Sequence, residues 1–237
     1  MYKKEFKELI NSSQKLYIGT GNPNSQILII GKECAIDKDR DYHRYKTEIE
    51  NNSEDWLMNI EKDIRCKDVD DWFSVVSPKY NPLYPYKGQL AKRLTKVDGV
   101  ENRGTSSTWV NYQKLRNLIY SEEIGLDTIN FHEDCFLTEF STIVGLYSSC
   151  VKKEHKKESI AQRSQLFQSS FFQQFPIVIT ACGMDVRDYS INLEELFNVK
   201  FQPATHIIEN TKSNWYNIHY GAGDQPKLLI HTNQLSM

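Results

Sequence analysis

Two short segments near opposite ends of the chain carry residue types that hydrolytic chemistry uses. The apolar run 26–30 is followed directly by Gly31, and Glu33 comes two residues later. The apolar run 227–230 is followed directly by His231. A carboxylate can activate or orient water, and a His can donate a hydrogen bond to an oxygen on which negative charge develops. Each residue taken alone could equally be an ordinary polar residue at the end of a core strand.

The elements that must position these residues follow an alternating pattern. Compact apolar runs, typical of strands buried on both faces, cover residues 26–30, 134–141, 176–183 and 227–230, and a shorter probable strand covers 205–208. Helical spacing of apolar residues covers 3–14, 39–64, 104–119 and 159–175. Because strands alternate with helices, a parallel sheet covered on both faces is the economical architecture. Ligands of such sheets bind outside the carboxyl ends of the strands, where Gly31, Gly183 and His231 should meet.

Length and charge limit the function classes. The chain has 237 residues, and we expect one domain over 1–237. Lys and Arg number 29 against 31 Asp and Glu, a formal net charge of -2. This balance disfavours a strongly basic protein that coats long stretches of nucleic acid, but it leaves room for a local basic cleft.

Cofactor and compartment signals are weak. The five cysteines are scattered and contain no Cys-x-x-Cys pair, so we expect no disulfide framework, metal site or iron–sulfur cluster. The glycines of 19–24 precede a strand, whereas a dinucleotide-binding fingerprint follows one, so no cofactor is expected. The N-terminus lacks a signal-peptide apolar stretch, and no run approaches the ~20 apolar residues of a spanning helix. We expect a cytoplasmic monomer without membrane association.

Two further segments allow more than one interpretation. The segment 77–88 contains three prolines and several tyrosines, so it is an irregular loop. It could form a wall for a planar ligand, or its tyrosines could simply pack into the protein. The charged run 152–157 could be a solvated helix face or could contact phosphates.

Four stretches resemble motifs of the uracil-DNA glycosylase superfamily. Gly31-Lys-Glu-Cys-Ala35 is similar to its first motif, Gly-Gln-Asp-Pro-Tyr-His or Gly-x-Asn-Pro-Gly. His231-Thr-Asn-Gln-Leu-Ser236 is similar to the closing motif, His-Pro-Ser-Pro-Leu-Ser. Trp72-Phe-Ser-Val75 resembles the Phe-Ser-Val stretch, and residues 177–183 resemble the penultimate core strand. The resemblance is confined to these four short stretches of the sequence.

The resemblance implies a fold and a catalytic pair. The fold would be a three-layer α/β/α sandwich with a central, mainly parallel four-stranded sheet, as in uracil-DNA glycosylases. Glu33 stands at the position of the water-activating Asp or Asn, and His231 would stabilise the departing base. Together they imply hydrolysis of the N-glycosidic bond of a flipped uracil or related base in DNA.

The resemblance also implies base-binding and DNA-binding residues. Phe73 would stack on the flipped base, and Ala35, in place of the family's Tyr, would leave a roomier base pocket. Glu139 stands on the strand that presents an Asn to the base edge, where an ionised Glu accepts but cannot donate a hydrogen bond. Leu235 and Ser236 would contact DNA, with Leu235 filling the space that the extruded base leaves.

Two other functions stay open at this stage. The chain could be a catalytically silent protein of the glycosylase fold that binds nucleic acid or a protein partner. It could also be an unrelated α/β hydrolase that acts on a free nucleoside or another small molecule.

Overall fold

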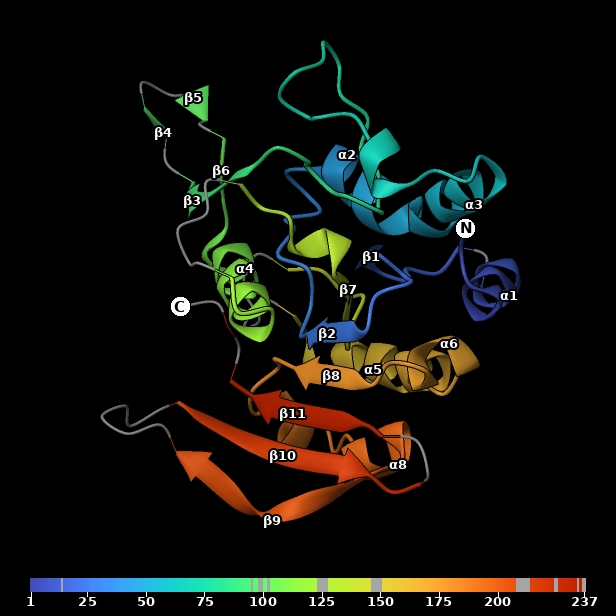
Figure 1. Cartoon of the computed structure of the whole chain (residues 1–237), viewed down its shortest axis with the longest axis vertical. Coiled ribbons are helices and arrows are strands. Elements are labelled where there is room, and N and C mark those ends of the chain that lie inside the picture. The colour runs from blue at the N-terminus through green and yellow to red at the C-terminus, as the bar shows by residue number, and fades with distance from the viewer. Residues whose placement is uncertain are drawn as a thin grey trace.

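A computed structural model describes residues 1–13, 15–94, 96–97, 100–101, 103–122, 128–145, 151–207, 214–223, 226–233 and 235, with the backbone alone at 96–97, 100–101 and 204–207. A seven-stranded sheet in the order β1-β7-β2-β8-β11-β10-β9 forms its centre (Figure 1). The strands are β1 (Thr20–Gly21), β2 (Ile27–Gly31), β7 (Cys135–Glu139), β8 (Ile177–Thr180), β9 (Val199–Ile207), β10 (Trp215–Gly221) and β11 (Leu228–Thr232).

The middle four strands form a parallel core. β7, β2, β8 and β11 pair in parallel, while β1 joins β7, and β10 and β9 extend the sheet beyond β11, in antiparallel fashion. The register places Ile30 beside Thr138 and Thr180, and Thr180 beside His231. The predicted α/β class with a mainly parallel core is therefore confirmed.

The prediction of a four-stranded sheet is wrong, because three strands extend it at its edges. β1 has two residues, too few for a recognisable apolar run. β10 has the sequence WYNIHYG and is mostly half-buried, so its polar residues hide it from a search for continuous apolar runs. β9 is much longer than the expected strand at 205–208, and it contains a proline, which suits an edge strand. His231 also lies within β11 rather than after it.

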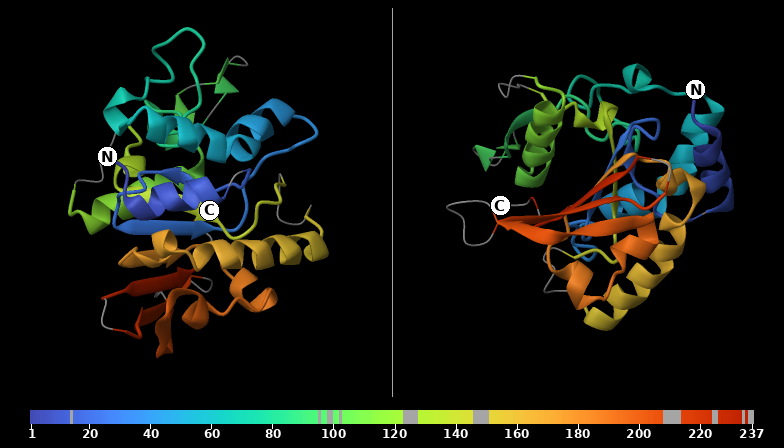
Figure 2. Two further views of the ribbon diagram at one scale, coloured as in Figure 1. Left: turned by 90° about the vertical axis from the view of Figure 1, so that its right-hand side faces the viewer. Right: turned by 60° about the horizontal axis from the view of Figure 1, so that its bottom comes forward.

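Helices lie on both faces of the sheet (Figures 1 and 2). The helices and turns are α1 (Lys4–Ser12), α2 (Tyr42–Tyr45), the π-helical turn η1 (Lys46–Glu50), α3 (Asn52–Glu61), η2 (Cys66–Asp68), α4 (Ser107–Ile119), η3 (Phe131–Glu133), α5 (Lys153–Phe167), α6 (Ser170–Gln173), α7 (Asp185–Asp188) and α8 (Leu193–Phe197). The predicted helix 39–64 is thus divided into α2, η1 and α3. The predicted helix 159–175 becomes α5 and α6, and α5 begins within the charged run 152–157.

Two small sheets lie outside the main one. β3 (Leu90–Arg93) pairs in parallel with β6 (Gly104–Thr105), and β4 (Lys96–Val97) pairs with β5 (Val100–Glu101) in antiparallel fashion. Ser106 follows β6 and caps α4, because its side chain accepts a hydrogen bond from the Trp109 amide. Among the helices that the structure describes, none has both the length and the apolar character needed to cross a bilayer.

Alternating residues of the parallel strands face two different cores. One set packs with aromatic residues of α1, α3, α5 and α6: Leu28, Ile30, Phe136, Val178 and Leu229. The other set packs against α4: Ile27, Ile29, Cys135, Leu137 and Ile179. Phe136 is at the centre of the larger core, and its ring meets that of Phe171 edge-on at 5.2 Å between centroids. Both faces of the sheet are therefore covered, which leaves its carboxyl-end edge as the place where polar side chains gather.

The central position of Phe136 predicts a large stability effect. Phe136→Ala should lower the free energy of unfolding by about 3–5 kcal/mol, because the removed ring leaves a cavity that the packed neighbours cannot fill. Urea titration followed by circular dichroism measures this loss. Val76→Ala, at a side chain that is 94% exposed, is the control and should change the value by less than about 0.5 kcal/mol. Equal effects of the two substitutions would show that this core is not packed as described.

Candidate functional site at the carboxyl ends of the parallel strands

Glycine at position 31 allows the ends of β2 and β7 to place a carboxyl group between them. Gly31 pairs with Glu139 in the parallel register. A Cβ atom at residue 31 would lie 2.2 Å from Oε2 of Glu139, which is closer than any real contact. The side chain of Glu139 therefore occupies the space above Gly31, and this glycine is required for that close approach.

Glu33 is held in a buried ion-pair network two residues beyond Gly31. Its carboxylate pairs with the ammonium group of Lys156 on α5, and Lys156 also lies 2.6 Å from Oδ2 of Asp185. Lys32 pairs with the other oxygen of Asp185 at 3.6 Å. The side chains of Glu33 and Lys156 are only 4% and 2% exposed, so this network belongs to the interior.

Lys156 stays charged in spite of its burial. Burial alone would lower the pKa of this ammonium group, but hydrogen bonds and charge attraction from Asp185 and Glu33 outweigh it and raise the pKa above its usual value. The interpretation of the run 152–157 as a solvated or phosphate-contacting face is therefore wrong at Lys156, which points inward from α5.

Glu139 has the opposite electrostatic character. Burial, together with the nearby charge of Glu33, raises the pKa of Glu139 to about 8, although Arg163 and Lys156 act in the other direction. Its Oε2 atom is buried and has no hydrogen-bond partner among the described residues. At neutral pH Glu139 is therefore mostly protonated, so it can donate as well as accept. The expectation of an ionised, accept-only Glu is corrected, because the site combines burial with a like charge.

Arg163 ties the backbone around this site together. Its guanidinium group donates to the carbonyl of Glu139 at 2.7 Å, and also to the Tyr17 carbonyl and the Thr138 hydroxyl. Burial lowers the pKa of Arg163 to about 10, so the group remains a cation at neutral pH. This buried positive charge holds the backbone at the end of β7, and no ion pair joins the Glu139 carboxyl to a residue that the structure describes.

Cys34, next to Glu33, is not an activated nucleophile. Burial raises the pKa of this thiol well above its usual value, and the charges of Glu139 and Glu48 act in the same direction. The Tyr17 hydroxyl is 4.0 Å from its sulfur. Cys34 is a protonated, structural thiol, so the chemistry available here rests on the carboxyl groups.

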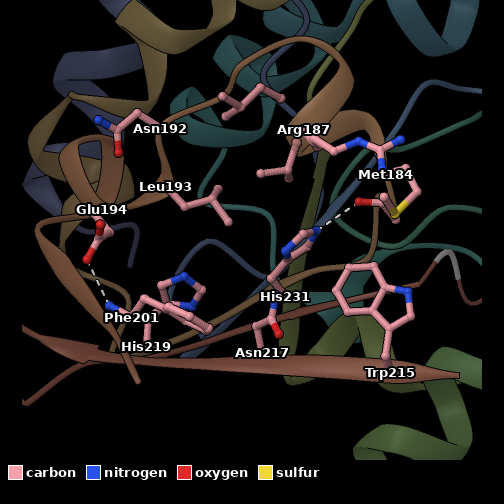
Figure 3. Close-up of a pocket in the computed structure, with 13 residues that line it drawn as sticks. Met184, Arg187, Asn192, Leu193, Glu194, Phe201, Trp215, Asn217, His219 and His231 are labelled. Carbon is pink, nitrogen blue, oxygen red and sulfur yellow. Dashed lines mark hydrogen bonds between the residues drawn. The ribbon is translucent and has the colours of Figure 1, made fainter. Parts of the chain in front are cut away.

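His231 points into a separate pocket between the β9–β10–β11 edge of the sheet and the α7–α8 segment (Figure 3). The pocket has a volume of about 610 Å³. Nε2 of His231 donates to the Gly183 carbonyl at 2.8 Å, and the ring meets Trp215 edge-on at 4.8 Å between centroids. Burial lowers the pKa of His231, more than the Gly183 hydrogen bond raises it. The ring is therefore neutral at pH 7, and its Nε2 proton is already used.

The proposed catalytic pair does not share this pocket. Neither Glu33 nor Glu139 is among the described residues that line it. The turn 183–185 connects the pocket with the ion-pair network. The Gly183 carbonyl accepts the hydrogen bond from His231, and the Asp185 carboxylate pairs with Lys156. The structure thus brings Glu33 and Glu139 together and places His231 on the other side of the 183–185 turn.

The other residues singled out in the sequence lie apart from this pair. Ala35 is exposed in the loop after β2. Phe73 is 37% exposed in a loop before β3, where the Arg103 guanidinium lies 4.8 Å above its ring, and no described contact joins it to the carboxyl pair. Leu235 packs on the α4 face, and its carbonyl accepts a hydrogen bond from Asn111 at 2.6 Å. Ser236 lies outside the described residues.

The tyrosines of the loop 77–88 pack into the protein rather than forming an open wall. Tyr84 is buried, and its hydroxyl donates to the Ile129 carbonyl at 2.8 Å. Tyr86 packs against Trp72 and Tyr80, and its hydroxyl bonds to Glu48. The packing interpretation of this loop therefore holds for these side chains.

Sequence reasoning missed the cations and the third carboxylate of the network. Asp185 follows β8 by a few residues, so the strand-end argument that selected Glu33 could have selected it too. Lys156 and Arg163 lie in a helix of low amphipathic contrast, and nothing in its spacing separates buried from solvated cations. His219, which also lines the pocket, lies on β10, a strand that the apolar pattern did not reveal.

Chemically, the strand ends offer one carboxylate held by an ammonium group and one protonated carboxyl group nearby. No set of three or more His, Cys, Asp or Glu side chains suited to a metal ion occurs among the residues that the structure describes.

Comparison of the sequence with models of known protein families and with curated proteins finds no match.

The raised pKa of Glu139 predicts a pH-dependent stability difference. The ordinary carboxyl pKa of 4.5 applies in the unfolded chain, and about 8 applies in the folded one. The stabilising protonation is fully present below pH 4.5 and is lost as pH rises through 8. The free energy of unfolding of the wild type should therefore fall relative to that of Glu139→Gln between pH 5 and pH 9, as measured by urea titration.

The exposed Glu61→Gln serves as the matched control for this experiment. Its difference from the wild type should stay constant over the same pH range. If the Glu139→Gln difference is equally constant, the carboxyl group of Glu139 is already ionised at neutral pH in the folded protein.

Proposed function

We propose that the protein is a DNA N-glycosylase that hydrolyses the bond between a flipped base and its sugar at the ends of β2 and β7. The observation that carries the proposal is the contrast between Glu33, paired with a cation, and Glu139, protonated at neutral pH. A carboxyl group that is protonated at neutral pH, close to a carboxylate that pairs with a cation, is a usual arrangement for an acid and its partner.

Each carboxyl group fits one requirement of N-glycosidic hydrolysis. As the carbon–nitrogen bond breaks, its electron pair moves to the base, and positive charge develops on the sugar. The Glu33 carboxylate stabilises that charge and orients the water, whose oxygen bonds to the sugar carbon while its proton passes to this carboxylate. Lys156 fixes the position of Glu33. The Glu139 carboxyl donates its proton, or a hydrogen bond, to the base. This replaces the base-stabilising role first expected of His231, whose Nε2 proton is committed to Gly183.

A protonated Glu139 also bears on the choice of base. Its hydroxyl can donate to a base oxygen while its carbonyl oxygen accepts from a base N–H, which is the pattern an amide side chain offers. Uracil and related deaminated bases present such an edge. We extend the proposal to DNA as the partner and to a three-layer, uracil-DNA glycosylase-like arrangement, both of which the sequence resemblance implies.

A second candidate is a catalytically silent protein of this fold that binds nucleic acid or another protein. The enclosure of Glu33 favours it, because the side chain is 4% exposed and already paired with Lys156. A carboxylate in that environment needs a local opening of the surrounding loops before it can meet a substrate. The two candidates differ in whether an abasic product forms.

The decisive assay uses oligonucleotides that contain uracil, hypoxanthine, xanthine or a mismatched thymine, in single and double strands. The wild type should give an abasic product on at least one. Glu33→Gln should lower the rate by about 100-fold or more, since the positioned carboxylate is lost. Glu139→Ala should do the same, whereas Glu139→Gln, which can still donate a hydrogen bond, should retain more activity.

The pH profile separates a chemical role of Glu139 from a structural one. The wild-type rate should fall above pH 8, where Glu139 ionises, and Glu139→Gln should lack this fall. Product from none of the oligonucleotides, with binding that weakens steeply with salt, would select the silent DNA-binding protein instead. Hydrolysis of free nucleosides but not of DNA would assign the site to a small-molecule hydrolase.

A further inference from the structure

The pocket beside β11 has the features of a ligand site that the carboxyl pair does not use. Its volume of about 610 Å³ lies in the range of small-molecule sites. Figure 3 shows Trp215, Asn217, His219 and His231 on the strands, with Glu194 and the rest of the α7–α8 segment on the other side. Aromatic side chains at Trp215 and Phe201 provide flat apolar surface for a planar ligand.

Two buried polar atoms of this pocket have no partner. Nδ1 of His219 and Oδ1 of Asn217 are both buried and lack a hydrogen bond to any described residue. The His219 side chain belongs to a residue that is only 6% exposed, and its ring lies 5.3 Å from that of Phe201. Buried polar groups are nearly always hydrogen-bonded in folded proteins, so these atoms indicate a missing partner.

The tautomers of the two histidines determine what that partner must offer. His231 donates through Nε2 to the Gly183 carbonyl, so its Nδ1 carries a lone pair. His219 bonds to the backbone of Leu229, and since its Nδ1 has no partner, that bond involves Nε2. Burial lowers the pKa of both rings, which keeps them neutral at pH 7. Both histidines therefore present an acceptor.

The charged groups of the pocket are also consistent with a ligand that donates hydrogen bonds. Glu194 lines it and is close enough to influence the His219 ring, and one of its oxygens accepts the Phe201 amide hydrogen at 2.8 Å. Among the described residues that line the pocket, Arg187 is a cation, and it is mostly exposed and pairs with Asp188 at 2.8 Å. The inner part of the pocket thus presents hydrogen-bond acceptors, and the Asn217 amide can act as a donor or as an acceptor.

We propose that this pocket binds a planar nitrogen heterocycle that carries an exocyclic amine, of the aminopurine or aminopyrimidine type. The two N–H groups of the amine donate to Nδ1 of His219 and of His231, and the ring lies against Trp215 and Phe201. This site does not depend on the hydrolytic function proposed for Glu33 and Glu139.

Matched nucleoside pairs test the proposal, because in each pair one member has the amine and the other has an oxygen in its place, with a proton on the adjacent ring nitrogen. Adenosine and inosine form one pair, and cytidine and uridine form the other. In calorimetric titrations, the amino member of at least one pair should bind about tenfold or more tightly than its partner, since the oxo group faces acceptors. In NMR spectra, the imidazole nitrogen signals of His219 and His231 should shift when it binds.

Substitutions of His219 and of control residues test whether the nucleoside binds in this pocket. His219→Phe keeps a ring but removes the acceptor and should weaken binding about tenfold or more, whereas His219→Asn should restore part of it through its amide oxygen. Tyr220→Phe, the next residue on β10, is exposed outside this pocket and is the matched control, and it should bind like the wild type. Glu139→Gln should also bind like the wild type, which separates this site from the carboxyl pair.

Each of the following results would overturn the proposal. The first is equal or tighter binding of inosine and uridine, and the second is the absence of binding by all four nucleosides at millimolar concentration. The third is unchanged binding by His219→Phe, or unshifted imidazole signals in the wild type. Tighter binding of free arginine than of any nucleoside would instead assign the acceptors to an aliphatic guanidinium ligand and would equally contradict it.

Discussion

The ion pair of Lys156 with Glu33 and Asp185 is the interaction on which this structure depends. It joins three elements that are far apart in the sequence: the loop after β2, helix α5 and the first turn of α7. Removal of one member of such a buried group leaves an uncompensated charge, at a cost of about 3–5 kcal/mol. Loss of the ammonium group would leave Glu33 and Asp185 without the cation that they share, so the network is also an electrostatic condition for the site.

This network has different consequences on its two sides. Toward β7, burial and, after it, the charge of Glu33 raise the pKa of Glu139, which makes that carboxyl group a donor at neutral pH. Toward β11, Asp185 anchors the turn whose Gly183 carbonyl fixes the tautomer of His231. The same cluster therefore supports the carboxyl pair proposed for hydrolysis and the acceptor-rich pocket proposed for a second ligand.

The sequence predicted the parts of the fold that follow from burial on both faces. The runs around Ile27–Gly31, Cys135–Glu139, Ile177–Thr180 and Leu228–Thr232 are continuous and apolar, and they form the parallel core. The β9–β10 extension was not predicted as a pair, because β10 is mostly half-buried, the described side chains of β9 are mostly exposed, and both strands mix polar with apolar types. Glu33 was found by the strand-end argument and Glu139 through the resemblance, but the protonation of Glu139 depends on neighbours that only the folded chain assembles.

The contrast between the two carboxyl groups is the central claim, and a site-specific titration tests it most directly. Carbon-13 NMR of the glutamate side-chain carboxyls, with Glu139 assigned by comparison with Glu139→Gln, follows ionisation in the folded protein. The structure predicts a midpoint of about 8 for Glu139, and a lower midpoint in Glu33→Gln, where the neighbouring charge is gone. A midpoint near the ordinary value of 4.5, unchanged by Glu33→Gln, would contradict the account.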